Sequence, residues 1–370
     1  MTKLQIKNLR KTYGAFTAVE GLDLAIEQGE TVALLGPSGC GKSTTLNMIV
    51  GLTEPSAGDI RIDGRSMLGV PPGKRGIGLV FQDYAVFGNM TVRENLAFGL
   101  KVRRMAKRDI AEEVEKTADL MGLTDSLDNP TTGMGGSQLQ RVALGRTLVT
   151  NPSILLLDEP LSNLEAAMRN EMRQELRRIQ KQTGQTVIYV THDQIEALSL
   201  AHRIAVMEQG RLVHYGDTHE VYHFPKETFV GGFLGDPPMN FLSGSIQSSA
   251  AGTFVDIGCA SIQVNKVSPE LSLQNGRKVT LGVRPESIDL LAPGASDVRA
   301  EILLIEQLGA DTIVTLLLGA HEIKLRSTRD VSHQIGETCS LRFHTGMISL
   351  FDAETGVQVI TPTANKENAA

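Results

Sequence analysis

The chain has 370 residues and a hydrophobic fraction of 41%, enough for two or three packed domains. Its formal net charge of −6 argues against nucleic acid as the main partner, because phosphate binding needs a basic face. No apolar run approaches the ~18 residues of a membrane span, and the N-terminal sequence MTKLQIKNLR has no apolar core of a signal peptide. Cys40, Cys259 and Cys339 follow no metal or disulfide spacing, so we expect a soluble chain in a reducing, cytoplasmic compartment.

Residues 1–235 alternate short apolar runs with segments of helical period. The runs predicted to be buried strands are TVALLG (31–36), GIGLVF (76–81), SILLLDEP (153–160) and TVIYVTHD (186–193). Between the last two, residues 164–182 have the spacing of an amphipathic helix. This alternation predicts an α/β domain with a mostly parallel sheet and helices on its faces.

The pattern changes around GDPPMNFL (235–242). From there to about residue 352, short alternating runs are separated by Gly, Asn and Asp turns: FVDIG, KVTLGV, AEILLIEQLG, TIVTLLLG, HEIKLR and CSLRFH. Runs of this kind predict a small all-β, OB-like accessory domain. We therefore expect a nucleotide-binding domain at 1–235, a β-rich domain at 236–361 and a disordered tail at 362–370.

The sequence GPSGCGKST (36–44) fits the phosphate-loop pattern G-x-x-x-x-G-K-[ST] between a predicted strand and a predicted helix. Its glycines let backbone N–H groups curl round phosphates, and the helix N-terminus adds partial positive charge. Lys42 is expected to reach the β- and γ-phosphates and Ser43 to ligate Mg²⁺, with Cys40 as a small loop filler. The residues predicted to cradle ATP are Gly36, Pro37, Ser38, Gly39, Cys40, Gly41, Lys42, Ser43 and Thr44.

An acidic pair ends the apolar strand ILLLDEP. At the end of that strand, Asp158 is placed to hold Mg²⁺ directly or through water, and Glu159 is the natural general base for water attack on the γ-phosphate. An acidic pair after a buried strand is also found at ordinary helix starts. The phosphate loop upstream favours the catalytic interpretation.

Together with three further segments, these motifs resemble the ATP-binding cassette (ABC) ATPases almost from end to end. The segments VFQDY (80–84), VTHDQ (190–194) and KTYGAFTAV (11–19) look like the glutamine loop, the histidine switch and the adenine-stacking loop of that family. The resemblance implies that Gln82 senses Mg²⁺ and the attacking water while touching a membrane partner. It implies that His192 contacts the γ-phosphate and that Tyr13 stacks on the base. In isolation, Gln82 would more often be a strand-end residue bound to backbone, and a surface role is a serious alternative for Tyr13. A lone histidine is more often structural, but the place of His192 directly after TVIYV favours the functional role.

The segment NMTVRENLAFGL (89–100) follows the glutamine loop and has Thr91 and Glu94 at capping-box spacing. In the ABC family this part of the helical subdomain is the docking groove for a coupling helix of the permease. An ordinary capped amphipathic helix would have the same sequence pattern.

The C-terminal half narrows the resemblance. GDPPMNFLSGSI (235–246), LGVRPESIDL (281–290) and IEQLGADTIVTLLLG (305–319) resemble the accessory (TOBE) β-domain of importer ATPases, most closely those serving sugars, polyols and glycerol phosphate. The resemblance implies an ATPase subunit on the cytoplasmic face of the inner membrane, with two permease subunits and an extracytoplasmic solute-binding protein. The alternatives are an importer for polyamine, sulfate, iron or phosphonate, a soluble ABC ATPase acting on DNA or ribosomes, and a regulatory module with little ATP turnover.

The stretch TTGMGGSQLQRVALGRTL (131–148) departs from the family signature L-S-G-G-Q. If the paired glycines set the register, Met134 replaces the signature serine, and if the downstream helix sets it, Gly135 does. Ser137 follows the glycines and either caps the helix or reaches the phosphate by a local shift. The residues expected to contact nucleotide here are Gly135, Gly136, Ser137 and Gln138.

A second departure lies in LSNLEAAMR (161–169), where Glu165 stands at a position that is usually Asp in the family. In ABC ATPases two subunits sandwich two ATP molecules, each between the phosphate loop of one subunit and the signature of the other. Because the phosphate loop, Asp158, Glu159 and His192 match the family while the signature does not, we expect pairing with a different, related ATPase rather than with a second copy.

Overall fold

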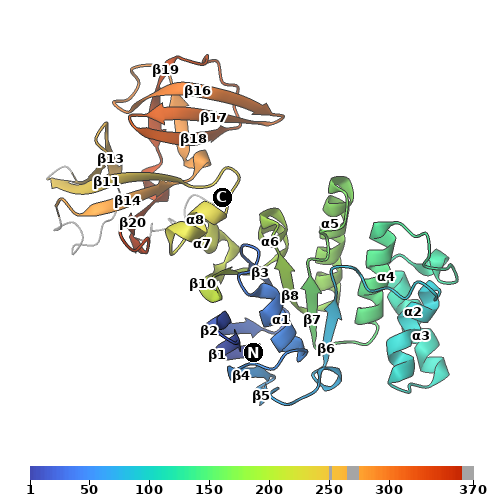
Figure 1. Ribbon diagram of the computed structural model, residues 1–370. Helices are drawn as coiled ribbons and strands as arrows, with labels where there is room; N and C mark the ends of the chain where they lie inside the picture. The colour runs from blue at the N-terminus through green and yellow to red at the C-terminus, as the bar shows by residue number, and fades with distance from the viewer. Residues whose placement is uncertain (250–251, 265–274, 361–370) are drawn as a thin grey trace. The chain divides into compact units, whose positions relative to one another are not determined.

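The computed structural model describes residues 1–249, 252–264 and 275–360, and its contacts divide the chain into the units Met1–Thr218 and His219–Ala370 (Figure 1). This division precedes the boundary near residue 235 that composition predicts. The tail predicted at 362–370 lies outside the described residues. Within the described ranges, no helix is both long enough and apolar enough to cross a membrane.

The first unit is built around a six-stranded sheet in the order β10-β9-β3-β8-β7-β6. Its strands are β3 (Thr31–Leu35), β6 (Ile77–Val80), β7 (Ile154–Asp158), β8 (Thr186–Thr191), β9 (Arg203–Glu208) and β10 (Arg211–Asp217). All are parallel except β10, which pairs antiparallel with β9. Every residue of β3 and β8 is buried, as expected for parallel strands covered on both faces. The predicted α/β class and its four predicted strands are confirmed.

A smaller antiparallel sheet has the order β2-β1-β4-β5. It comprises β1 (Thr2–Tyr13), β2 (Phe16–Glu27), β4 (Ala57–Ile62) and β5 (Arg65–Ser66). Buried side chains of this sheet, such as Leu4, Leu9 and Leu22, share one hydrophobic core with helix α1 (Lys42–Val50) and the central sheet. The phosphate loop is thereby fixed between two sheets.

The remaining helices of this unit pack around a second core. They are α2 (Val92–Val102), α3 (Lys107–Leu120), α4 (Gly136–Leu148), α5 (Ala166–Thr183) and α6 (Gln194–Leu200), with 3-10 turns η1 (Pro72–Lys74) and η2 (Thr124–Ser126). Figure 1 shows α2, α3 and α4 gathered beyond β6, as a helical subdomain. The predicted capping box of α2 is confirmed, because Thr91 Oγ1 accepts from the Glu94 N–H at 3.2 Å and the Thr91 N–H donates to Glu94 Oε2 at 2.9 Å.

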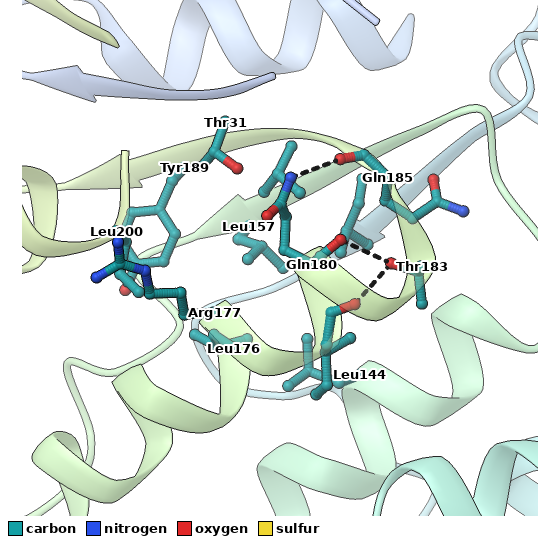
Figure 2. Close-up of a pocket in the computed structure, with 13 residues that line it drawn as sticks. Thr31, Leu144, Leu157, Leu176, Arg177, Gln180, Thr183, Gln185, Tyr189 and Leu200 are labelled. Atoms are coloured by element: carbon teal, nitrogen blue, oxygen red, sulfur yellow. Dashed lines mark hydrogen bonds between the residues drawn. The ribbon is translucent and has the colours of Figure 1, made fainter. Parts of the chain in front are cut away.

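Helix α5 covers one face of the central sheet and leaves a small cavity beside β7 and β8 (Figure 2). The cavity is about 30 Å³ and is lined by Leu157, Leu176 and Tyr189 among others. The Gln180 amide spans the gap by donating to the Gly29 carbonyl at 2.9 Å. A space of this size admits about one water molecule, so it is a packing gap and not a ligand site.

The second unit begins with two short helices, α7 (Thr218–His223) and α8 (Thr228–Phe233), and continues as two antiparallel sheets around one core. One sheet has the order β13-β12-β11-β14-β20-β21 and the other β15-β19-β16-β17-β18. The strands are β11 (Asn240–Ser249), β12 (Gly252–Asp256), β13 (Ser261–Val264), β14 (Lys278–Val283), β15 (Ile288–Leu291), β16 (Arg299–Leu308), β17 (Asp311–Leu318), β18 (His321–Ser327), β19 (Thr338–Phe343), β20 (Ile348–Asp352) and β21 (Gln358–Ile360), with turns η3 (Pro285–Ser287) and η4 (Thr345–Met347). The predicted all-β accessory domain is confirmed.

A buried arginine joins the two short helices to the sheets. Arg284 is 1% exposed, and its guanidinium donates to the carbonyl oxygens of Tyr222, Gly231 and Leu234. It also lies 4.1 Å from the centre of the Tyr222 ring, and burial lowers its pKa. The segment before residue 235 is therefore held by the β-rich unit, which explains why the contact boundary falls at Thr218.

Replacing Arg284 by Met is expected to lower the free energy of unfolding of the second unit by about 3 kcal/mol, since three buried carbonyl groups lose a charged donor. Chemical denaturation combined with hydrogen exchange in residues 219–234 measures this. The side chain of Arg299 is exposed and makes no hydrogen bond or ion pair with the rest of the described chain, so Arg299→Met is the matched control. Equal stability of the two variants would contradict the clamp.

Candidate active site

The loop between β3 and α1 leaves no room for side chains at two of its glycines. A Cβ on Gly36 would meet Cys40 Sγ at 2.6 Å, and one on Gly41 would meet the Ala18 carbonyl oxygen at 2.5 Å. Gly41 precedes α1 with a φ of 104°, in the region that favours glycine. The loop therefore presents bare backbone at a helix N-terminus, the arrangement that receives phosphate groups.

Lys42 is folded into this loop. The side chain is 7% exposed, and its Nζ donates to the carbonyl oxygens of Gly36 at 2.7 Å and Pro37 at 2.9 Å. Ser43, by contrast, is exposed, and so is Ser38. A buried ammonium inside a concave backbone, with a hydroxyl at its rim, fits a polyphosphate and its metal ion.

Two carboxylates follow β7 at the same edge of the sheet. Burial and the neighbouring Glu159 raise the pKa of Asp158, while Lys42 acts in the opposite direction. Glu159 has a φ of 44°, and its N–H donates to the Val190 carbonyl at 2.8 Å. A left-handed backbone is strained for glutamate, and such strain concentrates at functional sites. Carboxylate and hydroxyl oxygens are the kind of ligand that suits Mg²⁺.

Side chains from two other loops converge on Glu159. Its Oε1 lies 3.2 Å from His192 Nδ1, and its Oε2 accepts from Gln82 Nε2 at 3.3 Å. Gln82, Glu159 and His192 follow β6, β7 and β8, whose carboxyl ends share one edge of the parallel sheet. Gln82 and His192 lie 77 and 33 positions from Glu159 in the sequence, and the fold brings both within hydrogen-bond range of its carboxylate. The sequence motifs identified these residues but did not show that they meet.

Tyr13 lies at the end of β1, and its ring is 52% exposed. Lys11 Nζ is 5.0 Å from the centre of that ring, and Phe16, which begins β2, is 62% exposed. Two exposed aromatic rings on one hairpin, near a cation, offer a flat apolar face for stacking.

Sequence reasoning missed the residues that hold these loops in place. Ser162 Oγ donates to the Glu159 carbonyl at 2.9 Å, and Asn163 Nδ2 donates to the Gln82 carbonyl at 2.8 Å. Glu196 is 3% exposed and accepts from Thr191 Oγ1 at 2.7 Å, which ties the histidine loop to α6. Burial raises the pKa of Glu196. Ser162 and Asn163 follow the catalytic loop directly, but Glu196 has no sequence signal beyond its place on a short helix.

The helix of the signature region begins before Ser137, which one sequence hypothesis takes as its N-cap. Helix α4 begins at Gly136, and its N-cap is Gly135, with extended backbone at φ −67° and ψ 160°. The prediction that Ser137 caps the helix is wrong, because Ser137 is the second helical residue and an N-cap residue needs non-helical backbone. Met134 packs against the second core, and Gln138 is exposed. The helix start favours the register in which Gly135 replaces the signature serine.

Glu165 occupies the N-cap of α5, with a φ of −63° and a ψ of 154°. Its side chain is exposed and, among the described residues, makes no capping hydrogen bond. Aspartate is a preferred N-cap residue because its short carboxylate reaches the first backbone N–H groups, and glutamate is not. The departure noted in the sequence thus leaves the first turn of α5 uncapped at the end of the catalytic loop.

Three protein families match consecutive parts of the chain. The family described as ABC transporter matches residues 19–162, the MalK OB fold domain matches 235–288, and the TOBE domain matches 281–351. A solved structure, cbiO1 from Clostridium perfringens, part of the ABC transporter complex cbiONQ, is 30% identical with a TM-score of 0.55. The match covers 60% of this chain and 90% of the cbiO1 chain.

Several curated relatives match this chain over most of their own length. The trehalose/maltose import ATP-binding protein of Thermococcus litoralis is 41% identical over 96% of this chain and 99% of its own. The sn-glycerol-3-phosphate import ATP-binding protein of Rhizobium johnstonii is 38% identical over 100% of this chain and 99% of its own. The maltose/maltodextrin import ATP-binding protein of Escherichia coli O6:H1 is 43% identical over 84% of this chain and 85% of its own. The chain therefore belongs to the ATP-binding cassette transporter family, as an ATPase with C-terminal MalK-type OB and TOBE domains.

Proposed function

We propose that this chain hydrolyses ATP to power a membrane importer for a sugar, a polyol such as glycerol, or glycerol phosphate. The observation that carries the proposal is the meeting of Gln82, Glu159 and His192 at the sheet edge that also bears the phosphate loop. The class of solute follows from the relatives that import trehalose, maltose and sn-glycerol 3-phosphate.

ATP is held through its phosphates and its base. Lys42 exchanges its two loop carbonyl contacts for phosphate oxygens, and the backbone N–H groups of residues 36–44 surround them. Tyr13 stacks on adenine. Ser43, Gln82 and Asp158 are the residues that would hold Mg²⁺, which when bound supplies positive charge to the phosphate oxygens.

Hydrolysis needs a base aimed at water. Glu159 takes a proton from the attacking water. The Gln82 amide, which lies 3.3 Å from the Glu159 carboxylate, orients that water. His192, whose Nδ1 lies 3.2 Å from Glu159 Oε1, is the residue that would contact the γ-phosphate. Ser162 and Asn163 are positioning residues that hold the two loops.

The partner on the membrane side would be a cytoplasmic helix of each of two permease subunits. A groove of about 430 Å³ lies along α2 and α3, lined by apolar side chains that include Ala97, Met105, Ile110 and Val114. Lys101 and Lys107 border it. An amphipathic helix with its apolar face down fits such a groove. In this proposal the contact holds the chain at the cytoplasmic face of the membrane, and an extracytoplasmic binding protein delivers solute to the permease.

The second ATPase subunit would be a different, related chain. In a head-to-tail pair, this chain's phosphate loop and Glu159 are completed by the partner's signature, while Gly135 faces the partner's nucleotide. The missing hydroxyl removes a hydrogen bond to a charged phosphate, which costs ~1.5–3 kcal/mol. A homodimer would have this loss in both sites and would rely on glycine N–H groups alone.

Native mass spectrometry of the complex isolated from membranes with a tagged copy of this chain tests the assembly. We expect two permease subunits, one copy of this chain and one copy of a second ATPase with an intact signature serine. Two copies of this chain with no second ATPase would exclude the heterodimer, and a chain isolated without any permease would contradict the importer.

A further inference from the structure

The segment that carries Gln82 contains a backbone kink at Tyr84 and Ala85. Their φ values are 63° and 47°, so two consecutive residues with side chains adopt the left-handed conformation. This conformation favours glycine, and other residues keep it only where surrounding contacts hold them. Because Asp83 alone separates the kink from Gln82, the contacts that hold the kink also bear on where the Gln82 side chain lies.

The first of these contacts is the inward packing of Tyr84. Its ring is 8% exposed and belongs to the second core, together with residues of α2, α3 and α4. Gln82 and Asp83, which precede it directly, are exposed. The kink therefore turns one side chain into the core while it leaves Gln82 free to face the catalytic loop.

The carbonyl side of the kink is held by Arg146, which lies on α4. Its Nη1 donates to the Ala85 carbonyl at 2.6 Å, and its Nη2 donates to the Tyr84 carbonyl at 3.5 Å. The guanidinium also lies 4.9 Å from the centre of the Phe87 ring, a cation–π contact. Because a guanidinium presents its donors as a rigid planar fork, these contacts fix the direction of two consecutive carbonyl groups.

The backbone is anchored on both sides of this clamp. Before the kink, Asn163 Nδ2 donates to the Gln82 carbonyl at 2.8 Å. After it, the Phe87 N–H donates to Asn95 Oδ1 at 2.9 Å, and Asn95 Nδ2 donates to the Phe87 carbonyl at 3.1 Å. Arg146 holds the strained stretch between these two anchors, where a change of backbone conformation would move Gln82 relative to Glu159.

We propose that Arg146 is a positioning residue for ATP hydrolysis, which acts by fixing the kink from which the Gln82 amide reaches Glu159 at 3.3 Å. This inference rests on the proposed function, in which Gln82 orients the attacking water. Helix α4 begins at Gly136, so the helix that would carry the signature to the partner's nucleotide also holds the glutamine loop of its own chain.

A double-mutant cycle on ATP hydrolysis by the assembled complex tests this role. Its variants are Arg146→Met, Gln82→Ala and the combination of the two. We expect Arg146→Met to lower kcat about tenfold and to leave the affinity for ATP within about twofold of the wild type, since the phosphate loop is unchanged. If Arg146 acts through Gln82, adding Arg146→Met to Gln82→Ala lowers kcat by less than about twofold.

The matched control is Arg178→Met. Arg178 Nη2 donates to the Leu120 carbonyl at 2.7 Å, so this arginine also ties the helical subdomain to a neighbouring element, but at a carbonyl outside the glutamine loop. Its kcat should equal that of the wild type, and thermal denaturation checks the folding of every variant. If Arg146→Met does not fold, Arg146→Lys, which keeps the charge, replaces it in the cycle, with a smaller loss of kcat and the same lack of additivity.

Three outcomes overturn the proposal: equal kcat for Arg146→Met and Arg178→Met, a loss confined to ATP affinity, or losses that multiply in the double variant. Multiplied losses with a slow Gln82→Ala would remove Arg146 from this role and leave the proposed function intact. Wild-type hydrolysis by Gln82→Ala would remove the role of Gln82 and the positioning through it. The expected cycle in a complex that imports no solute would support Arg146 and contradict the importer.

Discussion

Replacing Glu159 by Gln is expected to slow ATP hydrolysis by ~10²–10⁴-fold while preserving ATP binding. The amide has the size of the carboxylate and can still contact Gln82 and His192, which lie 3.3 Å and 3.2 Å from the carboxylate oxygens. It cannot accept the proton of the attacking water. Single-turnover hydrolysis and nucleotide affinity, both measured in the assembled complex, separate the chemical step from binding.

The matched control is Glu171→Gln on α5, since Glu171 is exposed and lies away from the catalytic loop. Its turnover should equal that of the wild type. Near-normal turnover of Glu159→Gln would remove Glu159 from the role of general base, and a comparable loss in Glu171→Gln would show that the effect is not specific.

Replacing Lys42 by Ala is expected to weaken ATP binding by about 10- to 100-fold, because each hydrogen bond from a charged group contributes ~1.5–3 kcal/mol. The ammonium now donates to two loop carbonyls, so its loss also loosens the loop. Equilibrium titration with a fluorescent ATP analogue measures the affinity. Thermal denaturation without nucleotide checks that the variant is folded.

The exposed Lys7 on β1 provides the comparison variant Lys7→Ala, which has the same change of net charge. Its affinity for nucleotide should match that of the wild type. If Lys42→Ala bound ATP as tightly as Lys7→Ala does, the assignment of residues 36–44 as the phosphate site would fail.

The sheet and the phosphate loop were predictable because their causes are local. Parallel strands buried on both faces appear as continuous apolar runs, as in β3 and β8. A loop that must expose its backbone needs glycine at fixed spacing, and the close contacts at Gly36 and Gly41 account for that pattern.

Other features depend on contacts between distant segments and leave no pattern in the sequence. The buried Arg284 joins residues 222–234 to β14 across about fifty positions, a contact that no composition change in the sequence signals. The burial of Glu196 follows from Tyr189 and Thr191 on a neighbouring strand. The start of α4 at Gly136 was uncertain because glycine and serine both occur at N-caps.

ATP-driven uptake by the purified complex in proteoliposomes tests the central claim most directly. The ATPase subunits and ATP are inside the proteoliposomes, and the binding protein is outside. We expect a radiolabelled sugar, polyol or glycerol phosphate to accumulate with the wild-type chain and not with Glu159→Gln. Equal accumulation with the two chains, or ATP hydrolysis by a complete complex that accumulates none of these solutes, would contradict the account.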